Sequence, residues 1–215
     1  MTRHTILLPG LALLVAASGC SPARGPRPVA GEIPVAAARR AALATTVTVR
    51  GVVTVPSGAL DDGFAVQDRS GGVYVAAAKS PAHAPGEVVR VTGALVDDHG
   101  RLGLRPDSVR VTGRAALPAP RPVRTGAVGE STEGTLVRVR GRVVGGVVDD
   151  RPWGWKVTLD DGSGPLLVFV SAGTGIDAGG IRAGTRLEVD GFSGQYDDHH
   201  EVLPRSPADV RVLPE

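Results

Sequence analysis

The chain has 215 residues, and its 24 basic and 22 acidic side chains leave a formal net charge of +2 with the histidines neutral. This balance excludes the large basic excess of proteins that track a phosphate backbone along their length. Thirty glycines, 17 prolines and an aromatic content of 3% are typical of an all-β chain with many tight turns.

The first twenty residues read "MTRHTILLPGLALLVAASGC", a short basic start followed by an apolar run and small residues. The run is too short to cross a membrane as a helix and has the layout of an export signal. The ending "ASGC" resembles the lipobox of bacterial lipoproteins, which implies removal of residues 1–19 and lipidation, palmitate included, of Cys20. The alternative is an ordinary signal peptide in which Cys20, the only cysteine, is incidental. We therefore expect a chain anchored by lipid to the extracytoplasmic face of a bacterial membrane, in the cell envelope.

Residues 20–34 are rich in proline, glycine and arginine and predict a flexible tether. Beyond the tether, four sequence blocks occur twice in the same order, at an offset of 90 to about 101 residues. The paired blocks are "TVTVRGVV" with "LVRVRGRVV", "GFAVQDRSGGVYV" with "WKVTLDDGSGPLLVFV", "PGEVVRVTG" with "AGTRLEVDG", and "RPDSVRV" with "SPADVRV". The sequence therefore predicts two copies of one domain, residues 35–113 and 131–215, joined by a linker at 114–130.

Within each copy the apolar residues alternate with polar ones, as in half-buried strands. Val47 and Val49 share one strand face, whereas Thr48 and Arg50 share the other. The "DRSGG" and "DDGSG" segments carry the Asp and Gly of tight hairpins, and a glycine inside each first strand allows it to bend. We expect two tandem five-stranded β-barrels, each preceded by a short helical or irregular lead-in.

The segments "VTVRGVVT", "GFAVQDRSGGVYV" and "GEVVRVTG" resemble the bacterial OB-fold modules found beside extracellular nucleases and nucleotidases. The resemblance runs from about Val35 to Val212. It implies the OB-like barrel and a loose association with nucleic-acid enzymes. Because the shared motifs fix the barrel and its hairpin, the resemblance implies no active site.

Both copies place Asp-Asp-His between the fourth and fifth predicted strands, in "LVDDHGRL" and in "YDDHHEV". The simpler interpretation is a polar hairpin, since Asp initiates turns and tolerates their backbone. The alternative is a divalent-metal site made by Asp197, His199, His200 and Glu201. Adjacent residues of a strand point to opposite faces, so four consecutive ligands do not converge on one ion. The sequence favours turns over a metal site.

In OB folds, the loop between the first and second strands and the loop between the fourth and fifth strands form the rim of the usual ligand cleft. These loops are predicted at 56–63 and 96–101 in the first copy and at 145–155 and 194–201 in the second, and all are acidic, which counts against tight DNA binding. Rings in or near this region are candidate ligand contacts, because exposed aromatics stack on bases or sugars. The candidates are Tyr74 and Phe169, expected to face outward from their strands, and Trp153, Trp155 and Tyr196. The alternative for the two tryptophans is a packing plug over one end of a barrel.

Several surface arginines in the two copies alternate with valines. The simplest interpretation is a solvated strand face, and the alternative is a shallow anion-binding face. These residues are Arg50, Arg69, Arg138, Arg140 and Arg142.

The sequence contains no Gly-x-Ser-x-Gly, His-Glu-x-x-His or phosphate-loop motif and implies no cofactor. We therefore expect a non-catalytic binding or adaptor module whose ligand is a protein partner of the envelope, an oligosaccharide or a nucleic-acid fragment. The second hypothesis is an accessory subunit that hands single-stranded nucleic acid to an extracellular nuclease or nucleotidase. A metal-dependent hydrolase using the Asp/His turns is the third.

Overall fold

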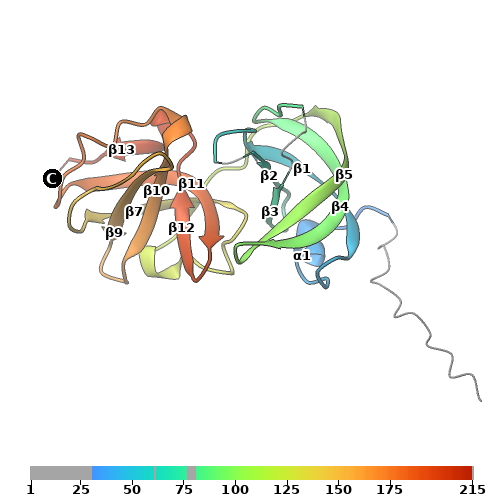
Figure 1. The fold of residues 1–215 in the computed structure, drawn as a ribbon, viewed down its shortest axis with the longest axis horizontal. Helices are drawn as coiled ribbons and strands as arrows, with labels where there is room; N and C mark the ends of the chain where they lie inside the picture. The colour runs from blue at the N-terminus through green and yellow to red at the C-terminus, as the bar shows by residue number, and fades with distance from the viewer. Residues whose placement is uncertain (1–30, 61, 77–80, 215) are drawn as a thin grey trace, which may run out of the picture.

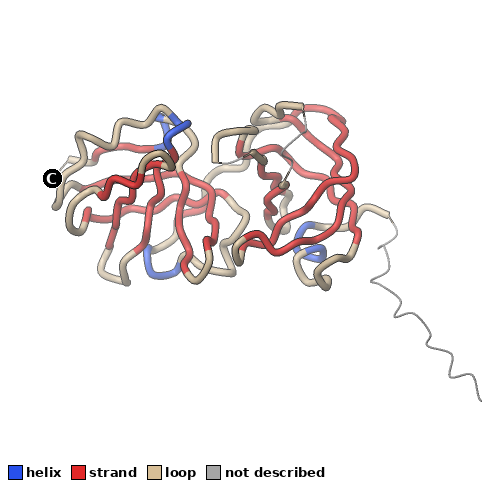
Figure 2. Tube along the Cα trace, viewed as in Figure 1, coloured by secondary structure: helices blue, strands red, loops and turns tan. Residues whose placement is uncertain are grey.

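A computed structural model describes residues 31–60, 62–76 and 81–214, in two β-rich halves that lie side by side (Figures 1 and 2). The predicted signal peptide, Cys20 and most of the tether lie outside the described residues. The all-β prediction is confirmed. Within the described ranges, every helix is too short or too polar to cross a membrane.

The first half is a closed five-stranded barrel with the strand order β1-β2-β3-β5-β4. The strands are β1 (Thr46–Val55), β2 (Phe64–Gln67), β3 (Gly72–Val75), β4 (Glu87–Asp98) and β5 (Arg101–Arg114). All neighbours are antiparallel except β3 and β5, which pair in parallel through Tyr74↔Gly103 and Val75↔Leu104. The sequence prediction of a five-stranded barrel is confirmed for this half.

The core of the barrel consists of the valines that the alternation placed on the inner face. Val47, Val49, Val89 and Val91 are fully buried, and helix α1 (Val35–Ala38) packs Val35 against them. Burying one such side chain contributes about 1.5 kcal/mol or more. Strand β1 pairs with β4 along its first part and with β2 along its last part, so one bent strand closes both sides of the barrel.

The second half is a sheet of β6 (Arg121–Pro122), β7 (Leu136–Val143), β8 (Val148–Asp150), β9 (Gly154–Asp160), β10 (Leu166–Ser171), β11 (Arg186–Tyr196), β12 (His199–Leu203) and β13 (Val210–Val212). Its path is β13-β11-β12-β10-β9-β7-β6, with β8 on β9 and a further pairing of β11 with β7. The pairings β7–β9, β9–β10, β10–β12, β12–β11 and β11–β7 therefore return to their starting strand.

The fifth strand differs between the halves. In the first half β5 is one strand with an irregularity beside Pro106, and it pairs with β4 along its whole length. In the second half the corresponding stretch is divided: β12 pairs with the end of β11 and β13 pairs with its beginning. Pro204 and Pro207 lie between them, and because proline has no N–H to donate, the ladder is interrupted there.

In each half, a serine of the β2–β3-type turn accepts a hydrogen bond from a backbone N–H of the lead-in. Ser70 Oγ accepts the Ala36 N–H at 3.0 Å, and Asp68 accepts the Val35 N–H at the start of α1. In the second half, Ser163 Oγ accepts the Gly126 N–H at 2.9 Å beside the 3₁₀ helix η1 (Thr125–Ala127). The two turn sequences that the repeat aligned therefore do the same structural work.

Asp161 provides a test of this turn. Its pKa is lowered, because the hydroxyls of Ser163 and Thr125 and the Ser163 N–H donate to the carboxylate, outweighing the opposing effect of burial. A group with a depressed folded pKa stabilises the fold above its unfolded pKa, and that stability is lost as the pH falls through the folded value. Asp161→Asn should therefore cost about 1.5 kcal/mol at neutral pH and progressively less below about pH 4.

Urea unfolding at several pH values measures this difference. Asp107→Asn is the control, since Asp107 is exposed and no hydrogen bond to its side chain is present among the described residues. A loss for Asp161→Asn that stays constant down to the acid end would contradict a role for its charge.

Candidate ligand-binding groove

A groove of about 690 Å³ lies where the two halves meet, and all four predicted rim segments contribute to it. The first half supplies residues from the β1–β2 loop, from β3 and from the β4–β5 turn. The second half supplies residues from the β8–β9 hairpin, from β10 and from the β11–β12 hairpin. Its lining includes Leu60, Asp62, Tyr74, Asp98, His99, Arg101, Asp150, Trp153, Lys156, Phe169, Gln195, Tyr196, His199 and Glu201.

The floor of the groove is formed by Tyr74 and Arg101. The guanidinium carbon of Arg101 lies 3.7 Å from the centroid of the Tyr74 ring, a cation–π contact, and Arg101 Nη2 donates to Asp98 Oδ2 at 2.5 Å. Gly63 gives the ring its space, since a Cβ there would lie 2.3 Å from the Tyr74 hydroxyl. The contact therefore fixes both side chains at the base of the groove.

Tyr74 corrects one expectation. It does point out of the first barrel, as the alternation predicted, but it is only 3% exposed. It packs with Val55, Leu60 and Ala65 against Phe192 and Leu203 of the other half. The second half covers this face, which a strand pattern within one copy does not reveal.

Trp153 and Trp155 have different roles. Trp153 is 72% exposed and lines the groove, whereas Trp155 is partly buried and packs against the core of the second half. Trp155 therefore does not line the groove, and the plug interpretation does not describe Trp153. Phe169, opposite Lys156 in the β9–β10 register, lies in the groove and is partly buried against the cluster between the halves.

The loop that presents Trp153 is held by local contacts. Arg151 donates from its side chain and its backbone N–H to Asp149, which lowers the pKa of that carboxyl to about 2. The Trp153 N–H donates to Asp150 O at 3.0 Å, and the Trp153 carbonyl accepts the Ala172 N–H at 2.9 Å. The exposed ring thus sits on a fixed backbone, which reduces the entropy lost when a ligand stacks on it.

The two Asp-Asp-His turns touch each other across the groove. The Asp197 N–H donates to the His99 carbonyl at 2.7 Å, and His99 Nδ1 lies 3.3 Å from Asp197 Oδ1. The rings of His99 and Tyr196 stack at 4.9 Å, and Tyr196 is 49% exposed. Sequence reasoning found both turns but not this contact, for which the repeated motif was the only signal.

The turn registers also differ from the sequence alignment. His99 and Gly100 occupy the hairpin loop in the first half, and Asp197 and Asp198 occupy it in the second. His99 and Asp197 both have positive φ, 54° and 50°, which Asn, Asp and His tolerate better than most residues. The polar-turn interpretation of both motifs agrees with this geometry.

The four residues considered as metal ligands, Asp197, His199, His200 and Glu201, do not form one cluster. His199 and Glu201 lie on one face of β12, with Nε2 and Oε2 4.0 Å apart, whereas His200 lies near Gly129 on the other side. Asp197 instead faces His99. Among the described residues, no group of three His, Cys, Asp or Glu side chains is arranged to hold a metal ion.

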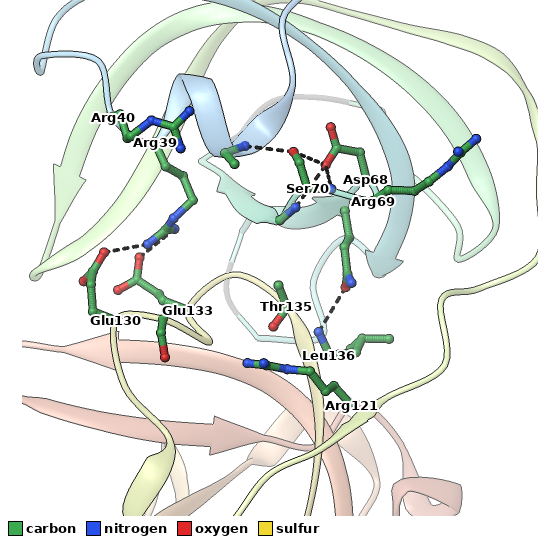
Figure 3. A pocket seen from close by; sticks show the side chains of 14 residues that line it. Arg39, Arg40, Asp68, Arg69, Ser70, Arg121, Glu130, Glu133, Thr135 and Leu136 are labelled. Carbon is green, nitrogen blue, oxygen red and sulfur yellow. Dashed lines mark hydrogen bonds and ion pairs between the residues drawn. The ribbon is translucent and has the colours of Figure 1, made fainter.

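A second hollow, of about 470 Å³, lies where α1 and the β2–β3 turn meet residues 130–136 (Figure 3). Arg39 joins the halves there, with Nη1 3.0 Å from Glu133 Oε1 and Nη2 2.8 Å from Glu130 Oε1. Arg69 points away from the hollow, whereas the side chain of Arg121 extends toward Thr135 and Leu136 (Figure 3). Since Arg39 of the first half pairs there with two carboxylates of the second, we interpret this hollow as a junction between the halves.

No family model matches the chain, and no curated protein matches it. Among solved structures, a murine DNA-binding protein bound to double-stranded DNA is 11% identical, with 78% of this chain and 97% of that chain covered and a TM-score of 0.38. The p204 HINb domain is 15% identical, with 76% and 95% covered and a TM-score of 0.35. The single-stranded DNA-binding protein from Thermus aquaticus is 13% identical, with 79% and 93% covered and a TM-score of 0.32.

Proposed function

We propose that this protein is a non-catalytic binding module of the bacterial cell envelope, built of two tandem OB-like barrels and held to a membrane through lipid on Cys20. The ring of pairings in the second half, in the same order as the first barrel, supports the tandem interpretation. The export signal and the "ASGC" ending support the anchor.

The observation that carries the binding function is the gathering of rings in one groove. Four of the five rings that the sequence singled out line it: Tyr74, Trp153, Phe169 and Tyr196. Rings in a groove formed by OB-type rim loops suit ligands with flat faces, either sugars or bases. Among the described lining residues there is no serine, threonine or cysteine to serve as a nucleophile, which supports a binding role.

The charges of the groove favour an oligosaccharide. Four lining carboxylates, Asp62, Asp98, Asp150 and Glu201, face only two permanent cations, Arg101 and Lys156. Both cations already pair with acids, Arg101 with Asp98 and Lys156 with Asp150 at 2.8 Å. A phosphate backbone needs a basic excess, whereas sugar hydroxyls donate readily to carboxylates. A neutral sugar chain stacked on Trp153 and Tyr196 therefore fits best.

Calorimetric titration of residues 31–215 tests this proposal, because every described core residue lies within that fragment. The probes are tetrasaccharides of N-acetylglucosamine and of glucose. We expect binding that changes little with salt, and Trp153→Ala should weaken it about tenfold through loss of one stacked ring. Val212→Ala, an equally exposed position outside the groove, should leave the affinity unchanged. Absence of heat with both sugars would contradict the oligosaccharide assignment.

The second candidate is an accessory subunit for single-stranded nucleic acid. The exposure of Trp153 and Tyr196 on one groove favours it, since successive bases stack on such rings in sequence-independent binders. Titration with a dodecamer of oligothymidylate at low and high salt distinguishes the nucleic-acid hypothesis from the oligosaccharide hypothesis. If oligothymidylate binds in a salt-sensitive way and Trp153→Ala weakens that binding, the ligand of the groove is nucleic acid and not a sugar.

A further inference from the structure

Three arginines form a row across the outer face of the first barrel. Arg50 of β1 lies directly opposite Arg90 of β4, which in turn lies directly opposite Arg110 of β5. All three side chains are exposed, and that of Arg90 is 48% accessible. Like charges in directly opposed cross-strand positions destabilise a sheet, so the row costs the barrel stability.

The row has little compensation within the described residues. Arg90 Nε lies 3.5 Å from Glu32 Oε2, and Arg50 Nε donates to the Thr112 hydroxyl at 3.5 Å. Glu32 is the one carboxylate that forms an ion pair with the row there, and it is itself 43% exposed. Three cations facing one carboxylate leave a face of positive charge.

The second half has the same row with one decisive difference. Arg140, Glu188 and Arg211 occupy the equivalent opposed positions on β7, β11 and β13. Glu188 accepts from Arg140 Nε at 2.5 Å and from Arg211 Nε at 2.8 Å, so the central acid pairs with both neighbouring arginines. The first row has Arg90 where the second has Glu188. One fold thus contains a row in which both arginines pair with a central acid and a row of three arginines that has one exposed carboxylate beside it.

The row of three arginines lies where the chain enters the barrel. Glu32 forms a bridge with Thr48 of β1, the Ile33 N–H donates to the Thr48 carbonyl at 2.8 Å, and Glu32 also contacts Arg90. Cys20 precedes residue 31 by only ten intervening residues, a reach of at most about 40 Å. A lipid on Cys20 would therefore hold this face close to the membrane surface.

We infer that Arg50, Arg90 and Arg110 form a docking face for the anionic phospholipid headgroups of the membrane that carries the Cys20 lipid. The inference rests on the proposed export and lipidation. The lipid provides attachment, and the row orients the first barrel toward the bilayer. This leaves the groove, which contains none of the three arginines, free for its own ligand.

Co-sedimentation of residues 31–215 with vesicles tests the row alone, because this fragment carries no lipid. The vesicles contain about 30% phosphatidylglycerol in phosphatidylcholine, or phosphatidylcholine only, at low ionic strength. We expect partition onto the anionic vesicles only. Arg50→Gln and Arg110→Gln should each lower it about fivefold, and Arg90→Glu by more.

Arg90→Glu also distinguishes lost docking from lost folding. It removes the exposed pair with Glu32, which is worth little, and places an acid between two arginines, as Glu188 is placed in the second half, so the melting temperature should stay the same or rise. Arg186→Glu is the matched control, because it makes the same charge change on β11, where Arg186 lies opposite Arg142. It should leave vesicle binding close to the wild-type level.

Three results would overturn the inference: no binding to anionic vesicles, an equal loss in Arg186→Glu, or oligothymidylate that binds through the row and displaces the vesicles. The last would assign the row to nucleic-acid phosphates instead. Sugar binding in the groove is measured separately on the same variants, and lipidation of the full chain is read by mass spectrometry. Absence of lipid on Cys20 would overturn the docking inference together with the proposed anchor, whereas loss of sugar binding in the groove would overturn only the ligand assignment.

Discussion

Replacement of Gly134 by alanine is expected to lower the free energy of unfolding by about 3 kcal/mol. Gly134 has a φ of +83°, and a Cβ on it would lie 2.2 Å from the carbonyl oxygen of Gly72. The contact is backbone against backbone, so no side chain can move aside. Gly72 belongs to β3 of the first barrel, and the Gly134 N–H donates to Ser193 of β11, so the clash would push the halves apart.

Gly184→Ala separates the clash from the backbone strain. Gly184 has the same φ of +83°, but nothing lies within 4 Å of its Cβ position, so we expect it to lose only about 1 kcal/mol. Urea unfolding followed by tryptophan fluorescence measures both variants. Equal losses for Gly134→Ala and Gly184→Ala would show that the close approach of Gly72 and Gly134 contributes nothing.

The contact between Gly72 and Gly134 matters for function because the groove depends on how the halves are placed. Further contacts fix the same arrangement: Arg39 to Glu133, the Gln67 side chain to the Leu136 N–H, and Arg205 Nη1 to the Thr54 carbonyl. A groove whose two walls come from different halves loses its shape if these contacts loosen. Gly134→Ala should therefore weaken ligand binding although Gly134 does not line the groove.

Local features were predictable from the sequence because their signals lie within a few residues. Alternation placed Val47 and Val49 in the core, and the polar turns appeared where Asp-Asp-His repeats. The division of the fifth strand into β12 and β13 also had a signal, since Pro204 and Pro207 cannot donate to a ladder. The pairing of "RPDSVRV" with "SPADVRV" predicted one fifth strand in each copy and did not take these prolines into account.

The placement of the halves had no such signal. Tyr74 points outward from its barrel as predicted, yet its burial depends on Phe192 and Leu203, more than a hundred positions away. The contact of His99 with Asp197 likewise joins residues 98 positions apart. The alternation of apolar and polar residues describes the two faces of one strand, and it identified rings that line the groove. It contains no information on the contact between the halves, so it did not show that four rim segments converge there.

Phe192→Ala is the second substitution with a large expected effect, a loss of about 4 kcal/mol. Phe192 is fully buried on β11 and is the largest fully buried side chain that the second half contributes to the cluster with Val55, Leu60 and Tyr74. Removing the ring leaves a cavity lined by parts of both halves, and each half retains its own valine core. We therefore expect the variant to unfold in two separable transitions, one for each half.

Calorimetric unfolding of residues 31–215 checks this, with Phe192→Leu as the control, which keeps most of the volume and should cost about 1 kcal/mol. Because Phe192 does not line the groove, a fall in sugar affinity in Phe192→Ala alone would show that the groove is held open by the cluster beneath it. A single transition with a loss below about 1.5 kcal/mol would mean that the cluster adds little and that polar contacts such as Arg39–Glu133 hold the halves together. The two results assign the rigidity of the groove either to its apolar base or to its ion pairs.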